Sequence, residues 1–198
     1  MHRIVPVGAW CISGFALNAS YVGGGFMSNY RRMFVPGGEY FFTVNLHDRS
    51  SDLLVRNIDA FRAAWRYVEG RMPFETVAAV VLPDHLHCIW QLPPGDDAYP
   101  TRWRLLKAHF TRSLGKAGVA VDGKRVGERG VWQRRYWEHV IRDDRDRLAH
   151  VDYIHNNPVK HGYCSRVDEW PYSTWRRWDA MSAGDPATPD YAVEPWDP

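Results

Sequence analysis

Stretches of alternating or continuous apolar residues predict four β-strands, with helix-periodic segments between them. The predicted strands cover residues 40–46, 76–82, 85–92 and part of 132–141. Apolar residues at helical spacing follow the first strand and predict a helix to about Glu69; they are Leu54, Ile58, Phe61, Trp65 and Val68. A second helix is expected through about Leu114 and a third before Pro158 and Gly162, and the three expected N-caps are Asp52, Thr101 and Asp144.

The order of these elements, β-α-β-β-α-β followed by a helix, predicts an α+β fold. It is the order of the ferredoxin-like or split βαβ arrangement, an antiparallel sheet with helices on one face. The other face of such a sheet is open and can serve as a working surface. The last helix is an addition to this plan, and it carries Tyr153.

Periodicity and composition divide the chain into three parts. Residues 1–28 contain a Gly-Gly-Gly run and no periodicity, which predicts a flexible extension. Residues 29–177 form the predicted domain. Residues 178–198 contain five acids and no Lys or Arg, and are expected to form an irregular acidic tail.

The net charge of +2 hides a basic middle segment. Residues 100–147 hold thirteen Lys or Arg and six acids, a local balance of +7. This pattern indicates a polyanionic partner, although a solvated charged surface would also account for it. Three widely spaced cysteines suit a reducing cytoplasm, and no apolar run approaches the ~18 residues of a membrane span, so no membrane partner is expected.

A histidine pair in the third predicted strand could bind a metal ion. His85 and His87 are two positions apart, so both point to one face, while Leu86 and Cys88 point to the other. Two imidazoles on one face can share an ion if a third ligand comes from elsewhere. By itself, such a pair is more often two surface histidines.

A tyrosine and an asparagine share one face of the last predicted helix. Tyr153 and Asn157 are four positions apart, and an Asn amide oxygen is a hard ligand suited to Mg²⁺ or Mn²⁺. Tyr153 could act as a nucleophile that forms a covalent intermediate. The alternatives are a core tyrosine with a bonded hydroxyl and an asparagine at a helix end.

Five segments in order give the chain a family resemblance: YFFTVNL (40–46), VLPDHLHCIW (81–90), WQRRYWEH (132–139), YIHNNPVKHG (153–162) and WPYST (170–174). Together they span roughly residues 29–175. The chain resembles the REP-associated tyrosine transposases, relatives of the single-tyrosine insertion-sequence transposases and of the wider HUH (histidine–hydrophobic–histidine) nucleases.

The resemblance implies a metal-dependent endonuclease that cleaves and rejoins single-stranded hairpin DNA, the repetitive extragenic palindrome. It implies that His85 and His87 bind the divalent metal, Mg²⁺ or Mn²⁺, with Asn157 as third ligand. Tyr153 is the implied nucleophile, forming a 5′-phosphotyrosine link and leaving a 3′-hydroxyl. It also implies a cytoplasmic, nucleoid-associated protein that works as a monomer with its site in cis, a homodimer being the alternative.

Further residues could contact DNA or assist the reaction. Five basic side chains could hold phosphates or could simply be surface charges: Arg102, Arg104, Lys107, Arg134 and Arg135. Trp103, Trp132 and Trp137 could stack on bases, although core packing is expected for at least two of them. His139 and His150 could shuttle protons, but exposed histidines are expected there. Tyr136 and Tyr163 are rival nucleophiles without a polar residue at i+4 on a predicted helix.

Two other functions fit parts of the pattern. A non-catalytic module could bind single-stranded nucleic acid by stacking bases on an RRM-like sheet, and the histidine pair would then be incidental. A metal hydrolase could activate water in place of Tyr153, and it would form no covalent protein–DNA adduct.

Overall fold

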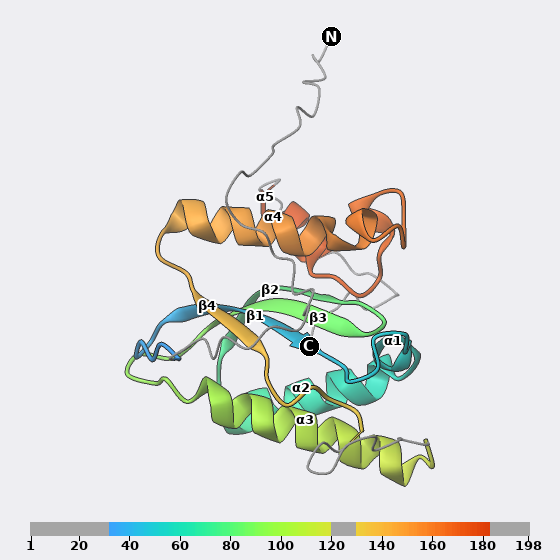
Figure 1. The fold of residues 1–198 in the computed structure, drawn as a ribbon. Helices are drawn as coiled ribbons and strands as arrows, with labels where there is room; N and C mark the ends of the chain where they lie inside the picture. Colours follow the sequence, from blue (N-terminus) through green and yellow to red (C-terminus); the bar gives the residue numbers. More distant parts are fainter. Residues whose placement is uncertain (1–31, 120–129, 183–198) are drawn as a thin grey trace, which may run out of the picture. The chain divides into compact units, whose positions relative to one another are not determined.

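The structure is a computed structural model that describes residues 32–119 and 130–182 of the 198-residue chain. The predicted N-terminal extension (1–28), residues 120–129 and residues 183–198 of the predicted tail lie outside the described residues. The described part contains a four-stranded sheet with helices on both sides (Figure 1).

The strands follow the predicted ferredoxin-like arrangement. Their order across the sheet is β2-β3-β1-β4, and every neighbouring pair is antiparallel. The bounds are β1 (Glu39–Asn45), β2 (Glu75–Val81), β3 (His85–Gln91) and β4 (Trp137–Val140). Strand β3 lies between β1 and β2, and β1 lies between β3 and β4. Both βαβ units are therefore split by a strand from the other unit, and the fold prediction is confirmed.

One face of the sheet packs on α2 (Ile58–Arg71) and α3 (Tyr99–Lys116). Alternate strand residues point to this side, among them Phe42, Cys88 and Trp90. The Trp90 and Trp103 rings stack at 4.2 Å between centroids, which places α3 directly against β3. This layer forms the larger hydrophobic core of the described residues.

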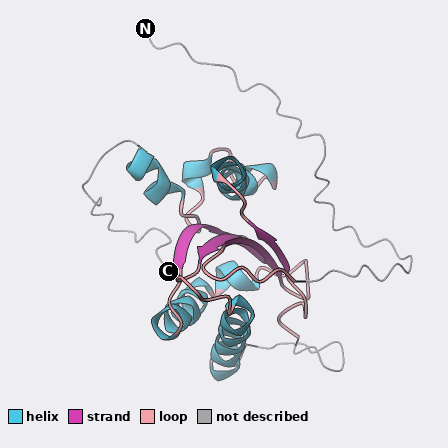
Figure 2. Cartoon of the chain, turned by 90° about the vertical axis from the view of Figure 1, so that its left-hand side faces the viewer, coloured by secondary structure: helices cyan, strands magenta, loops and turns pink. Residues whose placement is uncertain are grey.

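The other face of the sheet is covered by α4 (Asp144–Lys160). The second core cluster includes Phe41, Val80 and Ile89 from the strands and Val151 and Ile154 from α4, all buried. Figure 2 shows helices above and below the sheet. The expectation of an open sheet face is therefore wrong, because the additional helix buries its own apolar stripe there.

The helix starts differ from the predictions. The first predicted helix is divided into α1 (Leu53–Arg56) and α2, and Asn57 with φ −120° interrupts it. Asp52 precedes α1 without a side-chain cap. Helix α3 begins two residues before Thr101, since Pro100 is tolerated in a first turn, where its missing N–H is not needed.

The N-cap of α4 is Asp143 in place of the predicted Asp144. Its Oδ1 accepts a hydrogen bond from the Asp146 amide at 2.8 Å. The helix also continues through Pro158, which was expected to end it, to Lys160. Gly162, with φ +74°, then accommodates the left-handed turn that closes the helix, as predicted.

The remaining segments are short. Strand β4 lies within the predicted range 132–141, and Trp132 at the start of that range makes an isolated bridge with Leu46. The 3₁₀ helix η1 (Val167–Glu169) is followed by α5 (Trp175–Ser182). Residues 178–182, predicted to be irregular, are therefore helical. No helix in the described ranges combines the length and apolarity that crossing a membrane requires.

Candidate active site

The two histidines of β3 meet on the side of the sheet that α4 covers. Their ring centroids are 5.1 Å apart with an interplanar angle of 86°, and both residues are buried. Leu86 and Cys88 point into the core on the opposite face, as the alternation predicted. Burial and the positive charges of His85 and His161 hold the pKa of His87 well below its usual value. His87 is therefore neutral at physiological pH, the form that ligates metals.

Each histidine is oriented through its Nδ1 atom. Nδ1 of His87 lies 2.9 Å from the Thr43 hydroxyl, its register partner in β1, and Nδ1 of His85 lies 2.7 Å from Asp84 Oδ1. With each Nδ1 so engaged, Nε2 is the nitrogen through which each ring could bind a further partner. A polar partner on the second ring nitrogen is the usual support of a metal-ligating histidine.

Asp84 is itself held by a charged partner. Its Oδ2 lies 2.6 Å from Arg49 Nε. Burial would raise the pKa of Asp84, but the hydrogen bond to His85 and the charges of His85 and Arg49 together lower it below the ordinary value. The carboxylate stays ionised beside His85. No sequence pattern indicated a role in the site for Asp84, Arg49 or Thr43, although Asp84 directly precedes the histidine pair.

Tyr153 of α4 lies against His87. Their ring centroids are 5.1 Å apart at an interplanar angle of 73°. Burial raises the pKa of the Tyr153 hydroxyl, and a contact with the Asn157 side chain partly opposes this. The phenol is therefore protonated at physiological pH. Lys160, one turn beyond Asn157, places its Nζ 5.3 Å from the centre of the Tyr153 ring.

The Asn157 amide is buried without ordinary hydrogen-bond partners. Its residue exposure is 0%, and neither Oδ1 nor Nδ2 has a partner of normal geometry among the described residues. An unsatisfied buried amide costs about 1–3 kcal/mol, so such a group is uncommon without a role. The Asn157 Oδ1, together with two imidazole nitrogens, is a donor set that suits a divalent cation.

His161 also lies beside the site. It is the C-cap of α4. Its ring centroid lies 5.4 Å from that of His85, and the Tyr163 ring stacks on it at 5.9 Å. Tyr163 is 43% exposed, and the part of the chain around it is not helical. His161 belongs to the segment YIHNNPVKHG, but nothing in its spacing from the histidine pair indicated that they would meet.

Arg102 does not have the predicted phosphate-binding position. Its residue exposure is 0%, and its guanidinium donates to the Met72 and Pro73 carbonyl oxygens and to both carboxylate oxygens of Asp96, at 2.7–3.0 Å. This buried guanidinium links the end of α2 to the segment that leads into α3. The prediction of a DNA contact at Arg102 is therefore corrected to a structural role.

Three of the other basic candidates line one groove. Arg104, Lys107 and Arg134 share a groove of about 990 Å³ with Arg32, Arg112 and Lys116. It lies between α3 and the segment before β4. Burial lowers the pKa of Lys107 to about 8, and its Nζ donates to the Gln133 carbonyl at 3.0 Å. Arg135 is exposed but does not line the groove.

The three candidate tryptophans and Tyr136, the rival nucleophile, do not all lie on the same face of the sheet. Trp103 and Trp132 are buried in the larger core, as expected for at least two of the three. Trp137 packs edge-on against Phe41 at 5.6 Å, on the α4 side. The ring of Tyr136 lies in the groove under Arg32, at 4.4 Å.

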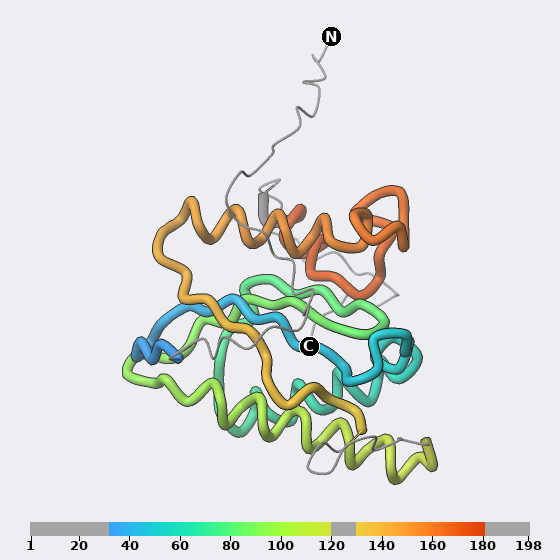
Figure 3. The backbone as a smooth tube through the Cα atoms, viewed as in Figure 1, coloured from blue at the N-terminus to red at the C-terminus, as the bar shows by residue number. Residues whose placement is uncertain are grey.

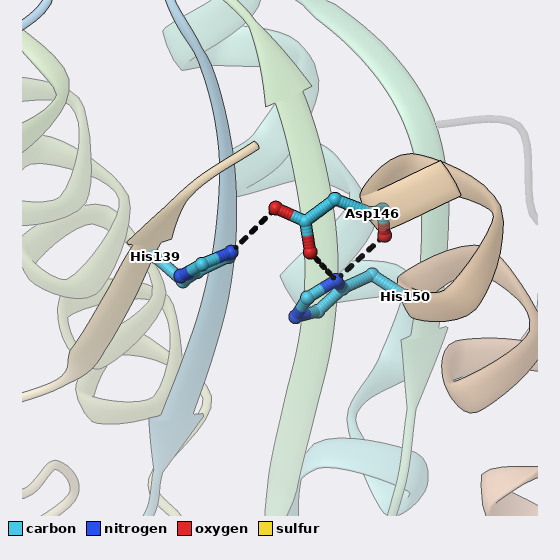
Figure 4. Close-up of side chains that lie close together, drawn as sticks. All are labelled: His139, Asp146 and His150. Atoms are coloured by element: carbon cyan, nitrogen blue, oxygen red, sulfur yellow. Dashed lines mark hydrogen bonds and ion pairs between the residues drawn. The ribbon is translucent and has the colours of Figure 1, made fainter. Parts of the chain in front are cut away.

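His139 and His150 are not isolated exposed residues, contrary to expectation. Both side chains are 19% exposed, and Asp146 lies between them (Figure 4). The cluster is separate from the His85–His87 pair, although His150 contacts Phe41, whose ring also meets His87 and Tyr153.

The chain was compared with known protein families, sequences and solved structures. No family model matches the chain. It is 47% identical over 151 residues to the REP-associated tyrosine transposase of Escherichia coli (strain K12), an alignment that covers 76% of this chain and 84% of that protein. It is 51% identical over 153 residues to a Haemophilus influenzae protein named for the same family, covering 76% and 87%.

A solved structure supports the same assignment. The structure of a REP-associated tyrosine transposase bound to a REP hairpin matches with a TM-score of 0.71 and 43% identity. The match covers 87% of this chain and 92% of that chain. With relatives at this identity covered over most of their length, the chain belongs to the REP-associated tyrosine transposases, a family of tyrosine transposase enzymes.

Proposed function

We propose that this chain cleaves and rejoins single-stranded DNA at hairpins of the repetitive extragenic palindrome type, with Tyr153 as nucleophile. The observation that carries the proposal is the position of Tyr153 against His87, with the buried amide of Asn157 one helical turn away. The relative whose structure holds a REP hairpin supports the choice of DNA.

The proposed reaction is a transesterification. The Tyr153 Oη bonds to the scissile phosphorus and gives up its proton as the bond to the 3′-oxygen breaks, and the 3′-oxygen takes up a proton. The products are a 5′-phosphotyrosine and a free 3′-hydroxyl. Attack of a 3′-hydroxyl on the phosphotyrosine reverses these steps and joins strands. One phosphodiester replaces another, so the reaction needs no nucleotide cofactor.

His85, His87 and Asn157 would hold a divalent ion, Mg²⁺ or Mn²⁺. When bound, such an ion would withdraw charge from the scissile phosphate as a Lewis acid. The chain's own part is to hold the ligands in place. Thr43 and Asp84 fix the two imidazoles, and the rigid helix α4 fixes Asn157 relative to Tyr153.

The basic groove would bind DNA phosphates. Arg104, Lys107 and Arg134 would contact the backbone there, and exposed Arg135 would extend the positive surface. The groove and Tyr153 lie on opposite sides of the sheet, but edge strand β4 joins them. Tyr136 lines the groove, while the next residue, Trp137, faces the α4 side. Figure 3 shows the chain passing from the α3 layer through β4 to α4.

The site would work in cis, in a cytoplasmic monomer. His85, His87, Tyr153 and Asn157 meet within a single chain, which a monomer requires. A homodimer that exchanges α4 is the alternative. Mixing a Tyr153→Phe variant with a His87→Ala variant distinguishes them, because only an exchanged helix restores an intact site.

The alternative of an RRM-like binding module has less support. That mode requires aromatic side chains on an open sheet face. The central aromatic of this face, Phe41, has 0% exposure beneath α4. Any binding without chemistry would therefore use the groove and not the sheet surface.

The test uses a labelled single-stranded hairpin from palindromes flanking the gene, incubated with Mg²⁺ or Mn²⁺ and separated on a denaturing protein gel. We expect a metal-dependent protein–DNA adduct that Tyr153→Phe abolishes while hairpin binding persists. Tyr163→Phe is the matched control and keeps the adduct. Cut DNA with no adduct would favour water as nucleophile, and binding without cutting would favour the non-catalytic module.

A further inference from the structure

A second cluster of metal-ligand side chains lies outside the proposed active site. Within the described ranges, His139, Asp146 and His150 each offer a ligand atom, and these atoms all lie within 4.8 Å of one another. His139 comes from β4, and the other two come from the first turns of α4 (Figure 4). None of them has a part in the proposed cleavage reaction.

We propose that His139, Asp146 and His150 form a second metal site, which takes a transition ion of the Zn²⁺ class. Two imidazoles and one carboxylate are a frequent three-residue set for Zn²⁺, with water completing the coordination. Mg²⁺ would bind here poorly, because it prefers oxygen ligands. The site is independent of the proposed strand-transfer function.

The fold brings the three side chains together from two directions. Asp146 and His150 are four residues apart, so they share one face of α4. His139 is the register partner of Phe41 in β1 and points to the same α4-facing side of the sheet. The connection from β4 to α4 is short, so the strand end and the helix start are held close together.

The separations of the ligand atoms suit a shared ion. His139 Nε2 lies 2.9 Å from Asp146 Oδ2, and His150 Nδ1 lies 3.2 Å from Asp146 Oδ1. Two ligands each about 2.1 Å from one ion are roughly 3.0–3.4 Å apart at octahedral to tetrahedral angles. The two imidazoles stack at 4.8 Å between centroids and would turn slightly to reach the same ion.

The charge states also suit a cation. Despite its burial, hydrogen bonds from His139 and Arg142 lower the pKa of Asp146 to about 2, so it is a carboxylate at physiological pH. Burial lowers the pKa of His150 below its usual value and favours the neutral ring. Each histidine is 19% exposed, which leaves the cluster open to an ion from solvent.

Three contacts compete with an ion. One is the Arg142 backbone N–H, which donates to Asp146 Oδ2 at 3.1 Å and leaves Oδ1 as the freer carboxylate oxygen. Arg142 Nε donates to Asp146 Oδ2 at 3.1 Å, and His150 Nδ1 lies 2.8 Å from the Asp146 carbonyl oxygen. The Arg142 side chain is 68% exposed and can turn into solvent when an ion arrives. An ion held here would cross-link β4 to α4, and its ligand His150 lies three residues before Tyr153 in α4.

The experiment measures Zn²⁺ bound to the untagged full-length protein by equilibrium dialysis and elemental analysis. The key protein is the His85→Ala/His87→Ala double variant, which removes the proposed catalytic ligands. We expect it to retain one Zn²⁺ per chain and to lose it when Asp146→Asn is added. Adding Asp144→Asn, an exposed neighbour in the same turn, leaves the ion bound. His139→Gln should weaken the affinity by at least about tenfold.

Removing the Arg142 guanidinium, which competes with the ion for Asp146, should strengthen Zn²⁺ binding, whereas loss of a ligand weakens it. Arg142→Ala should tighten Zn²⁺ binding about two- to fivefold, the range of one exposed ion pair. A purely structural His–Asp cluster predicts no such gain.

The melting temperature of the double variant with and without Zn²⁺ gives a second readout. Binding to the folded state raises it, and Asp146→Asn removes the rise. The site is refuted if the folded double variant binds no Zn²⁺, or if Asp146→Asn and Asp144→Asn retain it equally. Neither readout involves DNA, so loss of the proposed cleavage function would leave both unchanged.

Discussion

The Tyr153 ring meets the His87 imidazole edge-on, with 5.1 Å between the ring centroids. This contact joins α4 to β3 and places the only tyrosine of the YIHNNPVKHG segment beside the histidine pair. The tyrosine proposed to attack a phosphate thus lies next to the residues proposed to hold the metal. Asn157 extends the same arrangement by one turn of the helix.

Asn157→Leu should stabilise the metal-free protein while it abolishes metal-dependent cleavage. The substitution removes two buried polar atoms without ordinary partners and fills nearly the same volume. We expect unfolding in urea with EDTA to show a free energy higher by about 1–3 kcal/mol. Asn156→Leu, on an exposed neighbour, should leave cleavage unchanged. A loss of stability at Asn157→Leu would mean that the amide has an important partner in the folded chain.

Asp84→Asn should weaken the affinity for the metal that supports cleavage, without removing a proposed ligand. The carboxylate orients His85 and is itself held by Arg49, so its loss leaves the imidazole less firmly placed. We expect the half-saturating Mn²⁺ concentration for hairpin cleavage to rise about 10- to 100-fold. Asp52→Asn, whose carboxylate is 66% exposed, serves as the control. An unchanged half-saturating Mn²⁺ concentration would show that Asp84 does not support metal binding at the site.

Arg102 and Arg104 should respond in opposite ways although they are two residues apart in α3. Arg102→Met removes a buried guanidinium from two carbonyl oxygens and from Asp96, and should lower the free energy of unfolding by about 2–4 kcal/mol. Arg104→Met should leave stability within about 0.5 kcal/mol, because this side chain is exposed.

The same pair distinguishes structure from DNA contact. If Arg104 contacts a phosphate, Arg104→Met should reduce the slope of log affinity for the hairpin against log salt by about 0.7–0.9. Folded Arg102→Met protein should keep the wild-type slope. The reverse pattern would place the phosphate contact at Arg102 and contradict its structural assignment.

Hairpin affinity should depend on pH through Lys107. Burial lowers the pKa of this lysine to about 8, so it is charged at pH 7 and largely neutral at pH 9. Affinity should therefore fall about two- to fivefold as pH rises across this range, the value of one partly exposed charge contact. Fluorescence anisotropy with labelled hairpin in EDTA measures binding without cleavage.

Lys107→Arg provides the control, because a guanidinium remains charged throughout. Its affinity should be nearly constant between pH 7 and 9. If both proteins weaken equally, another group titrates and Lys107 does not contact DNA.

The sequence by itself determined the relations within single elements. Alternation in β3 put His85 and His87 on one face, and the four-residue spacing in α4 put Tyr153 and Asn157 on another. The order of strands and helices also predicted the ferredoxin-like sheet. Such relations follow from the 2.0 and 3.6 residue periods, which depend only on local backbone geometry.

Only the tertiary structure decided which of these faces meet. Register placed Thr43 behind His87, and packing of α4 closed the sheet face that was expected to be open. Long-range packing also buried Arg102 and brought His139 to Asp146 and His150. A local pattern shows that a side chain is polar or apolar, but burial and partners depend on segments far apart in the chain.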